Sequence, residues 1–321
     1  MKHLLIYTEG GLNLGLGNFY RCLSLCRAVS KRWDGKISFI SSSPESVCEL
    51  VKAAGLEIRR CEKEKVAEEI ISIRPELLLI DVLGIGREFT SKIRKAGIDI
   101  AIVGNDTDAN RDAALVVNAI IGTGLGNRAF TDEFGTLNLW GPEYLVLRDE
   151  FEALRDTYRH RGGIRSIVLL FGGSDQSDFT SRTLRRLGGK GYDISVIVGK
   201  AYPFLEELRS IAGEDAKVYC NISNVSEIYR SADFLFTSPG TALFEGLCLG
   251  IPSISFYQNE SQKEVFGDFF TCREFDSVQD PEMLMKKVYA GYEGFERERR
   301  SYNVGGGRDR IVTETIKLLE K

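Results

Sequence analysis

Short apolar runs alternate with amphipathic segments along most of this chain, and the alternation restricts the fold more than any single motif does. Apolar, β-branched runs predict strands at 3–8, 36–41, 77–82, 98–103 and 114–118. Helical spacing of apolar residues predicts helices between them, at 18–33, 44–54, 63–73 and 86–96. The run from Leu77 to Ile80 is apolar on both alternating faces, which is typical of a central parallel strand covered by helices on both sides. The series predicts an α/β fold with a doubly wound parallel sheet.

The rhythm breaks at residues 142–163 and then starts again. Pro142 precedes a strongly charged stretch from Arg148 to Arg161, and the apolar strand pattern resumes at Ile164. Further strands are predicted at 193–198, 216–219, 233–236 and 251–256, and helices at 176–188, 202–212, 224–231, 241–249, 260–269, 280–300 and 308–320. We therefore expect a domain at 1–150, a second domain at 151–305 and a C-terminal helix at 306–321. Two such domains imply a central cleft between the carboxyl ends of their strands, where open α/β sheets bind ligands.

Composition excludes several classes of function. The net charge is −4 over 321 residues, with no basic stripe, so nucleic acid is not an expected partner. No apolar run approaches the roughly 20 residues of a transmembrane helix, and the N-terminal residues lead straight into a strand rather than a signal peptide. Seven cysteines without a C-x-x-C pair, and only two histidines, predict neither a metal site nor a cofactor. A cytoplasmic enzyme or binding protein is expected.

A glycine-rich turn near the N-terminus is the first candidate site. Gly15 and Gly17 lie between the strand at 3–8 and the helix at 18–33, with Arg21 one turn into that helix. Glycines at such a junction let backbone N–H groups approach a phosphate or a sugar at the positive end of the helix. The spacing fits neither the dinucleotide fingerprint nor the Walker pattern. A long loop without a ligand remains an equal alternative.

The second half carries two related turns. Gly172 and Gly173 end a strand, and Ser174 is placed to cap the following helix; a tight turn with a capping serine is the plain alternative. Ser238, Gly240 and Thr241 form a small-residue turn before a helix whose free N–H groups would favour a diphosphate.

Two further positions complete this set. Glu245 lies one turn into the second of these helices, where its carboxylate can accept hydrogen bonds from a ribose; most helix glutamates are simply solvated. Asn259 and Gln262 follow the next strand and can bind sugar hydroxyls, or can belong to a polar loop that caps a helix.

These motifs, in this order, resemble the family that contains the UDP-sugar hydrolase of pseudaminic acid biosynthesis and the spore-coat polysaccharide proteins. The resemblance rests on 15–22, 78–81, 140–151, 171–175 and 238–245, together with Asn259. Members of this family are relatives of the lipid II-forming N-acetylglucosaminyltransferase and have the two-domain GT-B fold. The resemblance implies a UDP-sugar as partner, with Ser238 to Thr241 on the diphosphate, Glu245 on the ribose, Asn259 on the sugar, and the N-terminal glycine loop toward the sugar and the leaving phosphate.

The departures from this family bear on mechanism. Asn18 stands where the family hydrolases carry a catalytic histidine, and an amide cannot accept a proton in the useful pH range. Leu83 stands in place of a tyrosine, and the family's acidic pair appears here as Asn105 and Asp106. The nucleotide half of the pattern is complete, whereas the half that would activate water is not.

Three functions follow from this reading. The first is a glycosyltransferase of surface-polysaccharide biosynthesis that uses a UDP-sugar and an acceptor the sequence does not identify, with Asp106 as candidate base. The second is the sugar-nucleotide hydrolase, with Asn18 positioning water. The third is a nucleotide-sugar binding protein without catalytic activity. Transfer is placed ahead of hydrolysis.

Overall fold

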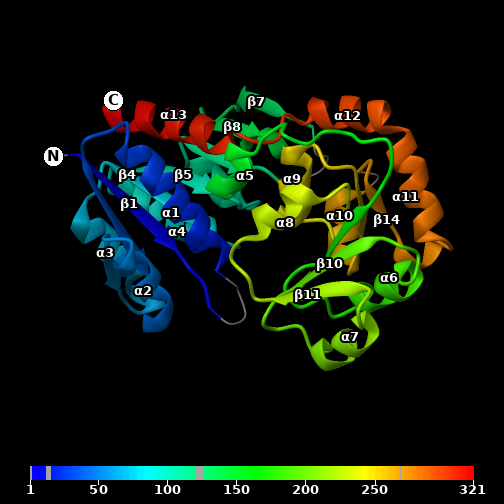
Figure 1. Cartoon of the computed structure of the whole chain (residues 1–321). Helices are drawn as coiled ribbons and strands as arrows, with labels where there is room; N and C mark the ends of the chain where they lie inside the picture. Colours follow the sequence, from blue (N-terminus) through cyan, green and yellow to red (C-terminus); the bar gives the residue numbers. More distant parts are fainter. Residues whose placement is uncertain (1, 12–15, 121–125, 268) are drawn as a thin grey trace. The chain divides into compact units, whose positions relative to one another are not determined.

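The computed structural model describes residues 2–11, 16–120, 126–267 and 269–321. Contacts divide the chain into two compact units. The first unit comprises Met1–Arg148 together with Gly305–Lys321, and the second comprises Asp149–Val304. Each unit is an α/β sandwich around one sheet (Figure 1).

The sheet of the first unit has the order β3-β2-β1-β4-β5-β6-β8-β7. Its strands are β1 (His3–Thr8), β2 (Lys36–Ser41), β3 (Glu57–Arg60), β4 (Leu77–Asp81), β5 (Asp99–Val103), β6 (Leu115–Asn118), β7 (Arg128–Thr131) and β8 (Leu137–Trp140). All neighbours pair in parallel except β7, which is antiparallel to β8. The five strands predicted in this half are confirmed to within one residue, and β3, β7 and β8 are additional.

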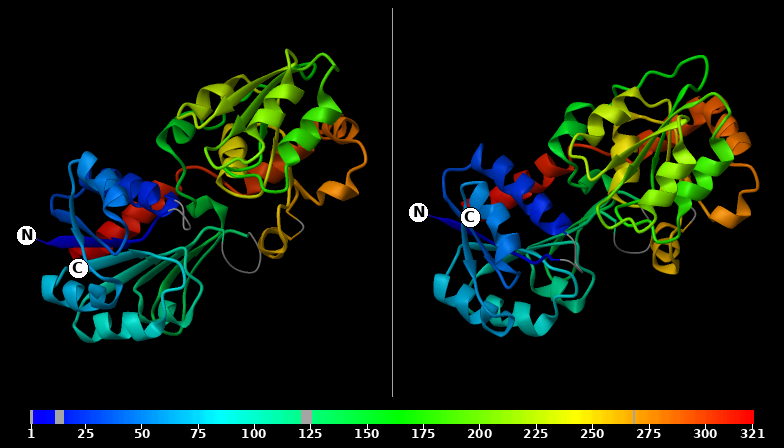
Figure 2. Two further views of the ribbon diagram at one scale, coloured as in Figure 1. Left: turned by 90° about the horizontal axis from the view of Figure 1, so that it is seen from below. Right: turned by 60° about the horizontal axis from the view of Figure 1, so that its bottom comes forward.

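Helices cover both faces of this sheet. They are α1 (Gly17–Ser30), α2 (Glu45–Ala53), α3 (Val66–Ile73), α4 (Arg87–Lys95) and α13 (Gly307–Glu320), with 3-10 turns at Lys63–Lys65, Asp108–Asp112 and Pro142–Tyr144. Phe19 of α1 and Val312 of α13 are fully buried in the core on one face, and Ile70 of α3 and Ile93 of α4 are fully buried in the core on the other. The C-terminal helix α13 runs beside α1 and so belongs to the first unit (Figure 2).

The second unit has a fully parallel sheet of order β11-β10-β9-β12-β13-β14. Its strands are β9 (Ser166–Leu170), β10 (Asp193–Val198), β11 (Ala216–Cys220), β12 (Phe234–Thr237), β13 (Ser253–Phe256) and β14 (Cys272–Arg273). The strand order reverses between β9 and β12, as it does between β1 and β4 in the first unit. Such reversal points open a crevice at the carboxyl ends of the strands, which is where doubly wound sheets bind ligands.

The helices of the second unit are α5 (Asp149–Ala153), α6 (Phe179–Leu187), α7 (Leu205–Ala212), α8 (Val225–Ser231), α9 (Thr241–Leu249), α10 (Glu260–Phe266), α11 (Pro281–Ala290) and α12 (Tyr292–Ser301), with a 3-10 turn at Phe275–Ser277. The single helix expected at 280–300 is wrong, because it consists of α11 and α12. Gly291 interrupts it with a ψ of 24°, outside the helical range. None of the helices in the described residues is long and apolar enough to cross a membrane.

Candidate functional site

Three loops of the second unit enclose a cavity of about 490 Å³ at the carboxyl ends of β9, β12 and β13. The cavity lies at the point where the strand order reverses, as expected for a ligand site in a doubly wound sheet. Seven residues predicted from the sequence line it: Gly172, Ser174, Ser238, Gly240, Thr241, Asn259 and Gln262. The fold thus brings together motifs that lie up to 90 residues apart in the chain.

Two glycines shape the wall of this cavity. Gly240 precedes α9 with φ +153° and ψ −163°, a conformation that is essentially restricted to glycine, and Gly172 has φ +92°. A Cβ at either position would point into open space, with no atom within 4 Å. Because no side chain covers the backbone at these two glycines, a ligand can approach the backbone closely.

The N-terminus of α9 is open toward this cavity. No side chain caps the helix, and the N–H groups of Leu243 and Phe244 bond back to the carbonyl of Gly240. In the described part of the chain, no acceptor pairs with the N–H groups of Thr241 and Ala242. Free N–H groups at the positive end of a helix favour an anion.

Asn259 and Gln262 have structural roles, and for Asn259 the capping role that the sequence offered as its alternative is confirmed. Oδ1 of Asn259 caps α10 by accepting from the N–H of Gln262 at 2.9 Å. The Gln262 amide donates to the carbonyl of Pro239 at 3.0 Å and accepts from the N–H of Gln258 at 2.8 Å. Both ends of the Gln262 amide are thus engaged, whereas no acceptor among the described residues takes the NH2 group of Asn259.

The expected capping role of Ser174 is wrong. Asp178 caps α6 by accepting from the N–H of Ser181, and the carboxylate of Asp175 accepts from the N–H groups of Phe179 at 3.1 Å and Thr180 at 2.7 Å. Asp175 is only 2% exposed, and burial raises the pKa of its carboxyl group although these hydrogen bonds oppose the shift. Ser174 lines the cavity instead.

Two other predicted residues lie outside the cavity lining. The backbone of Gly173 packs closely against Gly199, where a Cβ would come within 2.4 Å of the Gly173 carbonyl oxygen. Glu245 lies one turn beyond the start of α9 with its side chain buried at 2% exposure. Its assignment to a ribose stays a prediction.

In the first unit, Asn18 and Arg21 belong to a buried ionic cluster at the carboxyl end of β4. Arg21 binds Asp81 through two hydrogen bonds, Nη2 to Oδ1 at 2.6 Å and Nε to Oδ2 at 2.7 Å. Asp81 is 1% exposed. Nη2 of Arg21 also donates to Oδ1 of Asn18 at 2.8 Å. The oxygen of Asn18 therefore accepts from a guanidinium that is itself bound to a carboxylate.

A second buried carboxylate at this edge was missed in the sequence. Oε1 of Glu9 accepts from the hydroxyls of Tyr7 and Ser42, both at 2.6 Å, and Lys63 lies 3.6 Å from Oε2. The sequence gives little indication of this cluster, because the partners of Glu9 come from three separate segments. Hydrogen bonding to Glu9 and burial raise the pKa of Tyr7, with burial the larger cause.

The remaining residues predicted in the first unit are exposed or lie outside the described residues. Asp106 is exposed in the loop after β5, and no other described residue pairs with its carboxylate. Gly17 begins α1 and is exposed. Gly15 lies outside the described residues. Across the described ranges, no three His, Cys, Asp or Glu side chains are grouped to hold a metal ion.

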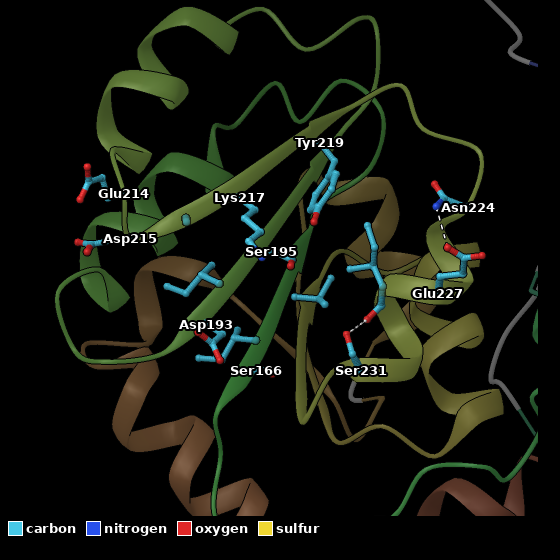
Figure 3. A pocket seen from close by; sticks show the side chains of 15 residues that line it. Ser166, Asp193, Ser195, Glu214, Asp215, Lys217, Tyr219, Asn224, Glu227 and Ser231 are labelled. Atoms are coloured by element: carbon cyan, nitrogen blue, oxygen red, sulfur yellow. Dashed lines mark hydrogen bonds between the residues drawn. The ribbon is translucent and has the colours of Figure 1, made fainter.

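Another cavity of the second unit, of about 520 Å³, lies over the face of β9, β10 and β11 beside α8 (Figure 3). Four carboxylates and one lysine are among its lining residues: Asp193, Glu214, Asp215, Glu227 and Lys217. Figure 3 shows the Glu227 carboxylate hydrogen-bonded to the amide of Asn224. None of its lining residues belongs to the three loops that line the first cavity. The carboxylates among its lining residues would repel a phosphate.

Known proteins support this fold. No protein-family model matches the chain. An uncharacterized protein of Methanocaldococcus jannaschii is 35% identical over 277 residues, which cover 82% of this chain and 57% of that protein. The spore coat polysaccharide biosynthesis protein SpsG of Bacillus subtilis is 25% identical over 276 residues, covering 81% of this chain and 78% of SpsG. The chain thus spans little more than half the length of the first relative, and it is distantly homologous to SpsG.

Two solved structures are similar over the whole chain. MurG of Acinetobacter baumannii has a TM-score of 0.66 at 12% identity and covers 99% of this chain and 100% of its own. The chain has the GT-B fold. UGT2 of Phytolacca americana, solved with UDP-2-fluoro-glucose and pterostilbene, has a TM-score of 0.66 at 10% identity and covers both chains completely. The predicted fold class of two doubly wound domains is confirmed.

Proposed function

We propose that this protein is a glycosyltransferase of surface-polysaccharide or glycoconjugate biosynthesis that uses a nucleoside diphosphate sugar, with a UDP-sugar as the expected donor. The observation that carries the proposal is the open N-terminus of α9 in a cavity whose glycines leave the backbone bare. The fold of MurG and UGT2, the bound UDP-2-fluoro-glucose of UGT2 and the name of SpsG support the same class.

The diphosphate of the donor would lie against the first turn of α9. The N–H groups of Thr241 and Ala242 and the hydroxyls of Ser238 and Thr241 are the donors at this position. As the bond between the sugar and the phosphate breaks, negative charge grows on the departing diphosphate, and preorganised donors stabilise that charge most. The helix N-terminus thereby performs a task that other enzymes assign to a metal ion.

The sugar is transferred by direct displacement at its anomeric carbon. The acceptor hydroxyl forms a new bond to that carbon, the bond to the diphosphate oxygen breaks with its electron pair, and the hydroxyl proton passes to a base. Asp106 is the candidate base, because its carboxylate is exposed and not engaged by other described groups. Asn259 is assigned to the sugar and Glu245 to the ribose.

Hydrolysis of a UDP-sugar is the weaker alternative. It needs a group that takes a proton from water, and the amide of Asn18 does not titrate in the useful range. Its oxygen already accepts from Arg21, which is itself bound to Asp81. Displacement by an acceptor hydroxyl does not depend on Asn18 as a base.

The test is release of the nucleotide, a diphosphate from UDP-, GDP- and ADP-linked sugars and the monophosphate from CMP-linked sugars, each with and without a panel of sugar and lipid-linked acceptors, in the absence of added metal. We expect release that depends on an acceptor. Equal release with and without acceptors would establish hydrolysis instead. Binding without release would indicate a nucleotide-sugar binding protein, and no binding of any of these donors would refute the proposal.

A further inference from the structure

Gln258 lines the cavity at the carboxyl ends of β9, β12 and β13 and contacts two other loops. Its Nε2 lies 2.5 Å from the carbonyl oxygen of Phe171, 2.9 Å from Oδ1 of Asp175 and 3.1 Å from Oγ of Ser238. Because the Phe171 carbonyl can only accept, the amide must present its NH2 group to these atoms. The group has two hydrogens for three acceptors, so at least one hydrogen is shared between two of them. Gln258 therefore joins the loops after β9 and β12 to the loop after β13.

This arrangement determines the direction of the Ser238 hydroxyl. A serine hydroxyl has a single hydrogen, and its oxygen can accept as well. Because Oγ of Ser238 accepts from Gln258, its hydrogen is free to point elsewhere. Within the described part of the chain no acceptor takes that hydrogen, and Ser238 borders the cavity. The hydroxyl is thus prepared as a donor toward the cavity.

Asp175 shows why this orientation needs a dedicated residue. Its carboxylate contacts the same amide nitrogen as Ser238, so the two side chains are neighbours. A carboxylate is a strong acceptor and would compete with a ligand for the hydrogen of Ser238. The Gln258 amide satisfies an oxygen of Asp175 and keeps the serine hydroxyl out of that competition.

We propose that Gln258 is a positioning residue of the nucleotide site, which turns the hydroxyl of Ser238 toward the cavity so that it donates to the phosphate groups of the ligand. The inference rests on the proposed function and adds a residue that acts through another rather than on the donor itself. Gln262 secures the same turn from a second point, through the carbonyl of Pro239.

A double-mutant cycle on UDP affinity tests this directly. Gln258→Ala and Ser238→Ala are each expected to weaken UDP binding about tenfold, as for the loss of one hydrogen bond to a charged group. The double variant should bind about as weakly as Ser238→Ala alone, because Gln258 acts through that hydroxyl. Gln258→Glu keeps the size but offers an acceptor to Ser238, so it should weaken binding at least as much. Gln279→Ala, an exposed glutamine of the same unit, is the control.

The outcomes separate the inference from the proposed function. The positioning role would be overturned if the wild-type protein binds UDP but the effects of the two single variants are additive, or if Gln258→Ala binds UDP with unchanged affinity. Either result would leave the nucleotide site intact. Failure of the wild-type protein to bind any nucleoside diphosphate would remove the proposed function and this inference with it. Hydrogen exchange of residues 171–177 and 238–242 without ligand checks that Gln258→Ala remains folded.

Discussion

Gly240→Ala should abolish most nucleotide binding while leaving the second unit folded. The substitution puts a methyl group where a Cβ now has no atom within 4 Å, at the mouth of the first turn of α9. A phosphate held at that distance loses one or two hydrogen bonds to N–H groups, each worth roughly 1.5–3 kcal/mol. We expect a loss of about 3 kcal/mol, or about 150-fold in Kd, measured by isothermal titration with UDP.

Gly250 provides a matched control at the other end of the same helix. It has φ +97°, and a Cβ there would meet its neighbours at ordinary contact distances of 3.5–3.7 Å. Alanine at either glycine should cost roughly 1–3 kcal/mol of folding free energy from backbone strain, measured by urea unfolding. Only Gly240→Ala should lose affinity. Unchanged UDP binding by Gly240→Ala, or an equal loss in Gly250→Ala, would refute the placement of the diphosphate on α9.

Four further predictions concern other residues. Arg21→Met leaves the buried carboxylate of Asp81 unpaired and should lower the free energy of unfolding by about 3–5 kcal/mol in a urea titration, whereas a loss below about 1 kcal/mol would show that the ion pair is not structural. If Glu245 binds the ribose, wild-type protein should prefer UDP over 2′-deoxy-UDP and Glu245→Ala should lose that preference; an unchanged preference would assign the ribose elsewhere. Asn18→His adds a titratable group and should raise acceptor-independent hydrolysis of the donor, and no gain would count against a competent hydrolytic scaffold. Asn118 is 1% exposed with neither amide atom paired in the described residues, so Asn118→Leu should stabilise the fold by about 1–2 kcal/mol, and destabilisation would indicate that the amide has a partner in solution.

The elements that sequence predicts well are those that must be buried. The strand β4 is buried at all five positions, and its leucines and isoleucine predict a buried strand. The missed strand β7 is exposed at every position, and β3 is exposed at three of four, so neither shows apolar alternation. Their pairing with a neighbouring strand makes them part of the sheet, and pairing is a tertiary property. The division between α11 and α12 was missed because the apolar spacing continues across Gly291.

In the candidate site, too, the features set by local sequence could be predicted and those set by tertiary contacts could not. Gly172, Gly240 and Thr241 could be predicted because a glycine or small-residue turn between a strand and a helix is a local pattern. The contacts of Gln258 with Phe171 and Asp175 could not, because they join residues more than 80 positions apart through single hydrogen bonds. The local sequence predicts the backbone conformation of the cavity loops. The hydrogen bonds between these loops depend on the assembled sheet and cannot be predicted locally.

The two reversal points carry different polar groups, and the proposal of transfer rather than hydrolysis rests on that difference. At the second, the groups without a partner among the described residues are N–H and hydroxyl donors, which suit a leaving anion. At the first, the charged groups already have partners: Arg21 is bound to Asp81, and Glu9 accepts from two hydroxyls with Lys63 3.6 Å away. The proposed transfer assigns proton removal to Asp106, outside this cluster. Within the cluster, Nδ2 of Asn18 donates to the carbonyls of Glu9 at 3.5 Å and Asp81 at 3.4 Å, so the cluster links the loop ends of β1 and β4.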